Sequence, residues 1–216
     1  MSAMDKIIMF PKPVWIKKLD IDADAILELL KNEKYFSIDN NTTRIKCYKT
    51  YTLKLLKDPG FEQLNEQAQI MVDEINRDYL KCVPGLKCMP SWGTKPEPGG
   101  MGYPHQHNSS ILSAVYYPSE PQSIAFEDPN TFNKLHPMPL VKERTEWNAA
   151  QWTLSTKKNF LVMYYSNTVH QLCYNDQKEN RYSIAMDWVQ DTRGNFDLPE
   201  DSKNEIEYRR KIVYGD

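Results

Sequence analysis

The sequence predicts a mainly β fold, a sandwich or barrel with helices packed on one outer face. Apolar segments of strand length, separated by Pro, Gly and Asn turns, follow one another from residue 86 to residue 189. Before them, an apolar stripe at helical spacing predicts one long helix between residues 60 and 80. Thirteen Tyr and five Trp favour a β-rich body over a helical bundle. Short strands after a helical front half are typical of such a layered fold.

Length and charge restrict the class of protein. The 216 residues suffice for one domain with a substantial core. We expect a strand and helix support at 1–85, a β core at 86–190 and a polar tail at 191–216. The net charge of -2 provides no excess of positive charge that would attract nucleic acid or an anionic membrane. No apolar run approaches a membrane span, and Met1–Phe10 lacks the apolar centre of a signal peptide, so we expect a cytoplasmic protein.

The four cysteines are expected to be free, reduced thiols. They are Cys47, Cys82, Cys88 and Cys173. None forms a Cys-x-x-Cys pair, and the spacing of Cys82 and Cys88 matches no zinc template.

The first elements are an edge strand and a short helix. Residues 7–16 have strand character, but Pro11 and Pro13 cannot donate to a ladder, which predicts a position at the sheet edge. Asp22 or Asp24 can cap the helix that follows. Its expected apolar side consists of Ala25, Ile26, Leu29 and Leu30.

A turn at 39–42 and a strand within 44–56 come next, ending at Asp58-Pro59-Gly60. Asp58 is a suitable N-cap and Pro59 a suitable first helical residue. The long helix then presents one apolar stripe, which we expect to pack on a sheet: Phe61, Leu64, Ala68, Met71, Val72, Ile75 and Tyr79.

The β core is expected to contain seven strands. Their approximate ranges are 86–94, 103–117, 122–127, 151–154, 158–165, 168–174 and 181–189. The loop between Asp128 and Gln151 is long and Pro-rich and carries His136 and Trp147. Such loops serve as lids or binding loops, or are variable surface.

Histidines point to a metal site. Two of the four, His105 and His107, precede an apolar strand with one residue between them. On a strand, residues i and i+2 share a face about 7 Å apart, so both imidazoles can reach one ion. His170, just past a turn between apolar segments, is a better third ligand than His136 in the long loop. Neutral imidazole suits Fe, Zn, Cu or Ni.

The last strand suggests a carboxylate-binding pocket beside this site. By strand parity, one face carries Tyr182, Ile184, Met186 and Trp188, and is expected to pack against the helical layer. The other face carries Arg181, Ser183, Ala185 and Asp187. An arginine fork binds a carboxylate with two hydrogen bonds, and a serine hydroxyl can add a third. A dicarboxylate co-substrate that chelates a nearby metal needs this arrangement.

Taken in order, these motifs resemble the Fe(II)/2-oxoglutarate-dependent oxygenases, most closely a small subgroup of bacterial and phage oxygenases. The subgroup pattern is matched by Trp92, His105-Gln106-His107-Asn108-Ser109-Ser110, Tyr116-Tyr117, Phe126-Glu127-Asp128-Pro129, His170 and Arg181. Phe10-Pro11 and the long helix also fit, so the resemblance covers residues 7–189. The chain is more distantly similar to prolyl hydroxylases.

The resemblance implies a double-stranded β-helix, the jelly-roll or cupin-like fold, that holds Fe(II) by a facial triad. It implies that 2-oxoglutarate and O₂ are converted to succinate and CO₂ while a protein side chain or small metabolite is hydroxylated. His105 and His170 would be the two histidine ligands. Arg181 would bind the far carboxylate of 2-oxoglutarate, assisted by Ser183 and Tyr117. Membrane and nucleic-acid partners are not expected, whereas the C-terminal tail can cover a neighbouring copy.

One position departs from the superfamily pattern. The superfamily usually has His-x-Asp or His-x-Glu, and here the acidic position is His107. The site can be a three-histidine triad, His107 can be the first ligand, or Glu127 or Asp128 can supply the carboxylate. We favour three histidines.

Two other functions remain open. A cupin-like metalloprotein would use three histidines for Fe, Ni or Zn without 2-oxoglutarate. A non-catalytic jelly roll would bind no iron. Arg181 favours the oxygenase, because a cupin needs no inner-face arginine eleven residues after its last ligand.

Overall fold

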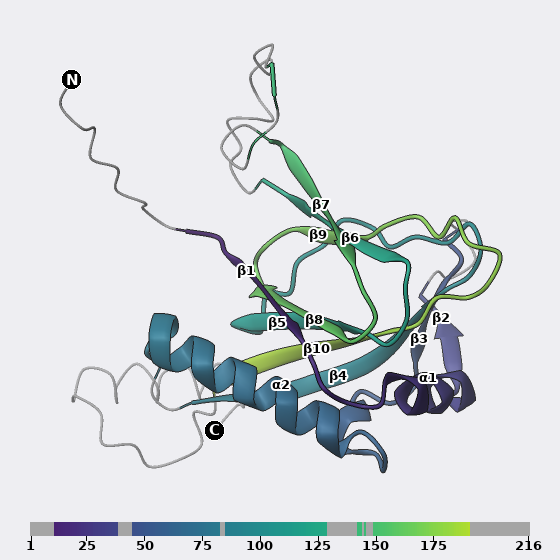
Figure 1. Cartoon of the computed structure of the whole chain (residues 1–216), viewed down its shortest axis with the longest axis horizontal. Coiled ribbons are helices and arrows are strands. Elements are labelled where there is room, and N and C mark those ends of the chain that lie inside the picture. The colour runs from purple at the N-terminus through teal and green to yellow at the C-terminus, as the bar shows by residue number, and fades with distance from the viewer. Residues whose placement is uncertain are drawn as a thin grey trace, which may run out of the picture.

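The computed structural model describes residues 11–38, 45–82, 85–128, 142–143, 145 and 149–190. They form two antiparallel sheets that face each other, with both helices on the outer side of the larger sheet (Figure 1). The larger sheet has the strand order β1 (Val14–Lys18), β8 (Phe160–Tyr165), β5 (Leu112–Tyr117), β10 (Ser183–Gln190), β4 (Leu86–Pro96), β3 (Cys47–Thr50) and β2 (Tyr35–Ser37). The smaller has the order β7 (Gln151–Thr156), β6 (Gln122–Glu127) and β9 (His170–Leu172). The predicted mainly β layered fold is confirmed.

The main hydrophobic core lies between the helices and the larger sheet. Helices α1 (Ala23–Asn32) and α2 (Glu62–Ile75) bury their apolar stripes against one face of β5, β8 and β10. From β10 this face carries Ile184, Met186 and Trp188, all fully buried. The predicted strand parity is therefore confirmed. The indole N–H of Trp188 donates to Gln69 Oε1 of α2 (3.1 Å), so its buried polar atom is satisfied.

A second, smaller core lies between the two sheets. It is built from the opposite face of β5 and β8 and from β6, with these members: Val115, Tyr117, Ile124, Phe126, Val162 and Tyr164. Because side chains alternate along a strand, each strand of the larger sheet contributes to both layers. The inner face of β10 is thereby left to small and polar residues.

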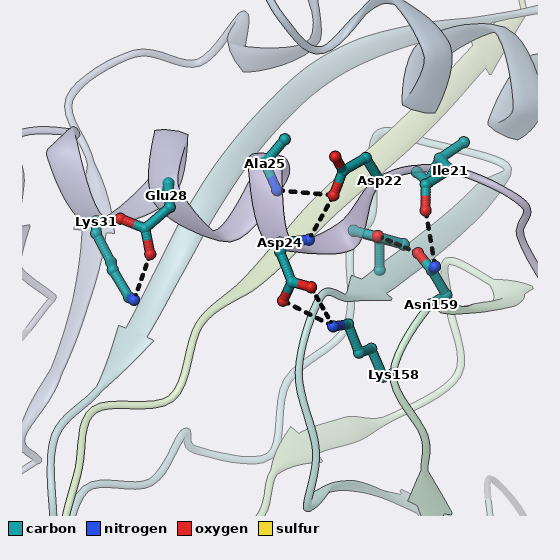
Figure 2. A network of polar contacts seen from close by, with 9 residues as sticks. Ile21, Asp22, Asp24, Ala25, Glu28, Lys31, Lys158 and Asn159 are labelled. Atoms are coloured by element: carbon teal, nitrogen blue, oxygen red, sulfur yellow. Dashed lines mark hydrogen bonds and ion pairs between the residues drawn. The ribbon is translucent and has the colours of Figure 1, made fainter.

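Helix α1 is attached to the turn between β7 and β8 (Figure 2). Asp22 caps the helix, since its Oδ1 accepts from the backbone N–H of Asp24 and of Ala25, both at 3.1 Å. Lys158 pairs with Asp24 at 2.6 Å, and Asn159 Nδ2 donates to the carbonyl of Ile21 at 2.9 Å. The predicted cap at Asp22 is confirmed. On the predicted apolar side, Ala25 is instead exposed, and Ala23 is buried in its place.

Helix α2 begins later than predicted. The expectation that Asp58 is its N-cap and Pro59 its first residue is wrong. Asp58 is extended and closes a short 3₁₀ turn, Leu55–Lys57, and Gly60 has a left-handed backbone (φ 94°) that no helix accepts. The helix starts at Glu62, whose carboxylate accepts from the Gly60 N–H at 2.9 Å. The predicted stripe is buried, except that Tyr79 lies in a π turn beyond the helix and is 65% exposed.

Other boundaries also differ. β1 is an edge strand as predicted, but within the described residues it begins at Val14. The segment 44–56 contributes only the short β3, and the three-residue β2 was not predicted. The predicted turn at 39–42, most of the loop with His136 and Trp147, and the tail at 191–216 lie outside the described residues. In the part of the chain that is described, no helix has the length and hydropathy that crossing a membrane requires.

All four cysteines are free thiols, as predicted, and two of them are strongly shielded. Burial raises the pKa of Cys47 to about 11 and that of Cys88 to about 12. At pH 8 we expect iodoacetamide to alkylate both at least roughly a hundredfold more slowly in the folded protein than in urea, because the thiolate is the reactive form. Mass spectrometry of the labelled peptides measures both rates. Equal rates in the folded and unfolded chain would contradict the prediction.

Candidate metal centre

Three histidines from two separate segments of the sequence meet in the wall of a cavity. The possible ligand atoms of His105, His107 and His170 all lie within 4.8 Å of one another. The ring centroids of His105 and His170 are 4.4 Å apart, and each lies 5.2 Å from that of His107. His170 is buried, whereas His105 is exposed at the outer side of the cluster.

Backbone hydrogen bonds place these residues. His105 and His170 exchange both N–H···O bonds, each at 2.9 Å, and the His107 N–H donates to the carbonyl of Ser166 at 2.8 Å. The expectation of a continuous strand over 103–117 is wrong, because within 103–111 only His105 forms a bridge and regular pairing starts at Leu112. The histidines are brought together by this bridge.

Backbone hydrogen bonds hold the glycine-containing segment that precedes the histidines, residues 99–102. The Gly102 N–H donates to the carbonyl of Leu172 (3.0 Å), and the carbonyl of Gly100 accepts from the Asn175 N–H (2.7 Å). A Cβ at Gly100 would lie 2.1 Å from the carbonyl oxygen of Lys46, so this close backbone approach requires glycine.

Each ring is oriented by an acceptor at Nδ1. The three acceptors are the Tyr103 carbonyl for His105 (2.8 Å), Asp187 Oδ1 for His107 (2.6 Å) and the Thr168 carbonyl for His170 (2.9 Å). Carbonyl and carboxylate oxygens only accept, so each Nδ1 carries the hydrogen and each Nε2 has a free lone pair. Histidines that bind metals have this hydrogen-bond pattern.

Burial also keeps the innermost ring neutral. It lowers the pKa of His170 to about 3, and the neighbouring His105 and His107 rings act in the same direction. At neutral pH the His170 imidazole is therefore uncharged, which is the form that binds a metal ion.

A buried carboxylate supports the middle ligand. Asp187 bonds to His107, and its Oδ1 also bonds to the hydroxyl of Ser113 at 2.6 Å. Ser113 in turn bonds to Ser166 at 2.9 Å. The sequence placed Asp187 on the pocket face by strand parity but did not predict its pairing with His107. Only the three-dimensional position of the loop before β5 shows that pair.

The predicted acidic alternatives lie outside the cluster. Glu127 ends β6, where its backbone N–H donates to Val169 (2.9 Å), and the Asp128 N–H donates to Ala150 (2.9 Å). Among the described residues, neither carboxylate joins the three histidines in a group that could hold a metal ion.

The histidines open into a cavity of about 720 Å³ between the sheets. Its other walls are mainly apolar or aromatic, with Ile38, Ile45, Pro90, Trp92, Tyr103, Val115, Ile124, Tyr164 and Leu172. Of the predicted polar face, Ser183, Ala185 and Asp187 line the cavity from β10, whereas Arg181 is not among the lining residues. The charged residues on the wall within the described part of the chain are Lys49 and Asp187.

Two further polar side chains, those of Arg181 and Tyr117, are buried beside the cavity. Arg181 is only 7% exposed, and its Nη2 donates to the carbonyl of Cys173. Its Nε and the hydroxyl of fully buried Tyr117 have no hydrogen-bond partner among the described residues. Desolvation lowers the pKa of Arg181. It raises the pKa of Tyr117, and the charge of Arg181 acts in the opposite direction by lowering the Tyr117 pKa. Ser183 bonds to Thr94 at 2.6 Å.

Two buried donors without a partner among the described residues are unusual, because buried polar groups are normally hydrogen-bonded. A carboxylate is the kind of group that can accept hydrogen bonds from an arginine and a phenol. The residues present therefore fit a metal ion at the three Nε2 atoms and a carboxylate at Arg181 and Tyr117.

Comparison with known protein families identifies one match. Residues 90–187 match the model of a family described as "Putative 2OG-Fe(II) oxygenase". This segment contains the three histidines, Tyr117, Arg181 and Asp187. No curated protein sequence matches the chain.

Solved structures with the same fold include three enzymes. HygX from Streptomyces hygroscopicus, with nickel, 2-oxoglutarate and hygromycin B bound, is 11% identical, with a TM-score of 0.59 over 83% of this chain and 84% of that one. The 2-oxoglutarate-dependent epimerase SnoN from nogalamycin biosynthesis is 12% identical, with a TM-score of 0.62 over 83% and 79%. A Pseudomonas putida prolyl-4-hydroxylase is 12% identical, with a TM-score of 0.55 over 82% and 92%. The shared fold is the double-stranded β-helix.

Proposed function

We propose that this chain is an Fe(II)/2-oxoglutarate-dependent oxygenase and that it holds Fe(II) through His105, His107 and His170. The observation that supports this most directly is the convergence of three rings whose Nδ1 atoms are all engaged by acceptors. With 2-oxoglutarate and O₂ bound, the iron supplies the oxidising chemistry, and succinate and CO₂ are released. Imidazole ligands suit iron.

The carboxylate pocket is the second part of the proposal. Arg181 and Tyr117 bind the far carboxylate of 2-oxoglutarate through two buried groups, the Arg181 Nε and the Tyr117 hydroxyl, that have no partner within the described ranges of the chain. Ser183, held by Thr94 on the neighbouring strand, lies on the same inner face and completes the pocket wall. A cupin-like site without 2-oxoglutarate would leave Arg181 and Tyr117 unsatisfied, which favours the oxygenase.

At the position of His107 the superfamily usually has an acidic metal ligand, and Asp187 takes over part of the role of that acid. Its carboxylate bonds to the Nδ1 atom of the His107 ring at 2.6 Å, which leaves the Nε2 atom of that ring for the metal. It also fixes the ring orientation, because both His107 and Ser113 bond to the same carboxylate oxygen.

The substrate is proposed to be hydroxylated, and a small metabolite or a protein side chain fits at the open side of the histidine cluster. Solved structures with the same fold include one with hygromycin B bound and two prolyl hydroxylases. We also propose a cytoplasmic location, since four free thiols are typical of a reducing compartment.

Anaerobic titration tests this function. Fe(II) followed by 2-oxoglutarate is expected to give a weak visible charge-transfer band, and admission of O₂ should convert 2-oxoglutarate to succinate. Bound Fe(II) is measured separately by a colorimetric chelator after desalting. A protein that binds Fe(II) but shows neither the band nor succinate would contradict the proposal.

A change at Asp187 tests its support of the metal. Asp187→Ala is expected to weaken Fe(II) affinity by roughly ten- to a hundredfold, the usual effect of losing a partner that orients a metal-binding histidine. Competition with a chelator of known affinity measures this. Asp20→Ala, at an exposed position, is the matched control and should leave the affinity unchanged. Unchanged affinity in Asp187→Ala would show that His107 needs no carboxylate partner.

A further inference from the structure

We propose that Lys49 and Trp92 form a subsite that binds the carboxylate of a small organic acid, the substrate of this enzyme. This rests on the proposed function, in which the metal and Arg181 bind the two ends of 2-oxoglutarate. With both ends of 2-oxoglutarate bound in this way, neither the metal nor 2-oxoglutarate provides an anion that would pair with Lys49.

Strand pairing places Lys49 in the wall of the same cavity as the three histidines. It lies on β3 opposite Thr94 of β4, and Thr94 lies opposite Ser183 of β10. All three line the cavity. Lys49 Nζ is 3.9 Å from the centre of the Trp92 ring, and that ring is 5.6 Å from the His107 ring. The amine therefore lies no more than about 10 Å from the His107 ring, so one small molecule can reach both.

Lys49 has no anionic partner in the part of the chain that the structure describes. Asp187, the other charged residue on the cavity wall, is engaged by His107 and Ser113. The Trp92 face compensates part of the amine's lost hydration, since a cation over an aromatic ring is attracted to it. Desolvation nevertheless lowers the pKa of Lys49, and an anionic ligand would offset that penalty.

The rest of the cavity defines the ligand further. The cavity lining that includes Lys49 and Trp92 also contains apolar side chains, among them Ile38, Ile45 and Pro90. The volume of about 720 Å³ is that of a small-molecule site. An organic acid with an apolar body matches both the amine and these walls, and a neutral or cationic ligand would leave Lys49 without a partner.

Matched probes test the subsite. Protein loaded anaerobically with Fe(II) and saturating 2-oxoglutarate is titrated calorimetrically with phenylacetate, 3-phenylpropanoate and hexanoate, and with the amide of each. We expect at least one acid to bind tenfold or more tighter than its amide. In Lys49→Met, which keeps the apolar stem, that preference should fall below threefold, whereas Lys49→Arg should retain it.

Lys95→Met is the matched control. Lys95 also lies over aromatic rings, 4.9 Å from Tyr35 and 4.8 Å from Tyr48, but is not part of the cavity wall. It should retain the full preference for acids. The subsite is overturned if acids and amides behave alike in the unmutated protein, including if none binds, or if Lys49→Met keeps the preference.

Failure of the subsite and failure of the proposed function give different results. If Lys49→Met loses the 2-oxoglutarate band while the unmutated protein shows it, Lys49 binds the co-substrate and the subsite is overturned. If the unmutated protein binds Fe(II) without that band, the oxygenase proposal fails. An acid preference that still depends on Lys49 would then support an anion site in a protein of different activity.

Discussion

Replacing His170 by alanine is expected to abolish stable Fe(II) binding and, with it, succinate formation. His170 is the buried member of the cluster, and its ring is held by the Thr168 carbonyl with Nε2 free toward the other two histidines. Loss of a direct ligand should lower the affinity by more than the roughly hundredfold seen when an outer partner is lost. The bound iron per chain after desalting measures the effect directly.

Two further variants make this result interpretable. His170→Gln keeps most of the side-chain volume in its contact with Tyr164, where the ring centroids are 4.7 Å apart, and should lose iron in the same way. His136→Ala, which changes the fourth histidine of the sequence, should retain it. Near-ultraviolet circular dichroism of the metal-free proteins establishes that each is folded. Full iron occupancy in a folded His170→Ala protein would exclude the three-histidine site.

Replacing Arg181 by methionine is expected to weaken 2-oxoglutarate binding roughly thirtyfold or more, while Fe(II) remains bound. Removal of one partner of a buried, hydrogen-bonded charge pair costs about 2–5 kcal/mol. Arg181 is buried and is not itself among the residues of the cavity wall. Within the described part of the chain, the cation on that wall is Lys49 of β3. The concentration of 2-oxoglutarate that half-saturates the charge-transfer band gives the affinity.

Two further variants, Tyr117→Phe and Arg181→Lys, test the same carboxylate pocket by the same measurement. Tyr117→Phe removes only the unpaired hydroxyl and should weaken 2-oxoglutarate binding less than Arg181→Met does. Arg181→Lys keeps the charge but loses the planar fork, so an intermediate effect is expected. If Arg181→Met binds 2-oxoglutarate as tightly as the unmutated protein, the far carboxylate is bound elsewhere.

Strand parity is the part of the site that the sequence predicts well. On β10, Ile184, Met186 and Trp188 enter the helical core while Ser183 and Asp187 line the cavity. The alternation of side chains depends only on local geometry, so it holds wherever a segment is a regular strand. The grouping of His105, His107 and His170 was also predicted from their residue type and order.

Contacts between distant segments could not be predicted in this way. His107 meets Asp187 only because its own segment leaves the sheet and bonds to Ser166. Lys49 reaches the cavity because a short strand, β3, pairs with β4. The misplaced start of α2 has a local cause, the left-handed conformation of Gly60, which a capping pattern alone does not reveal.

The mutual backbone pairing of His105 and His170 bears on how the centre acquires its ion. These residues are sixty-five positions apart in the sequence, yet two backbone hydrogen bonds of 2.9 Å join them. The ligands therefore lose most of their conformational freedom when the chain folds, and little remains to be lost when an ion arrives. We therefore expect the chain to fold before an ion binds at the proposed centre, and to keep its fold when one ion is exchanged for another.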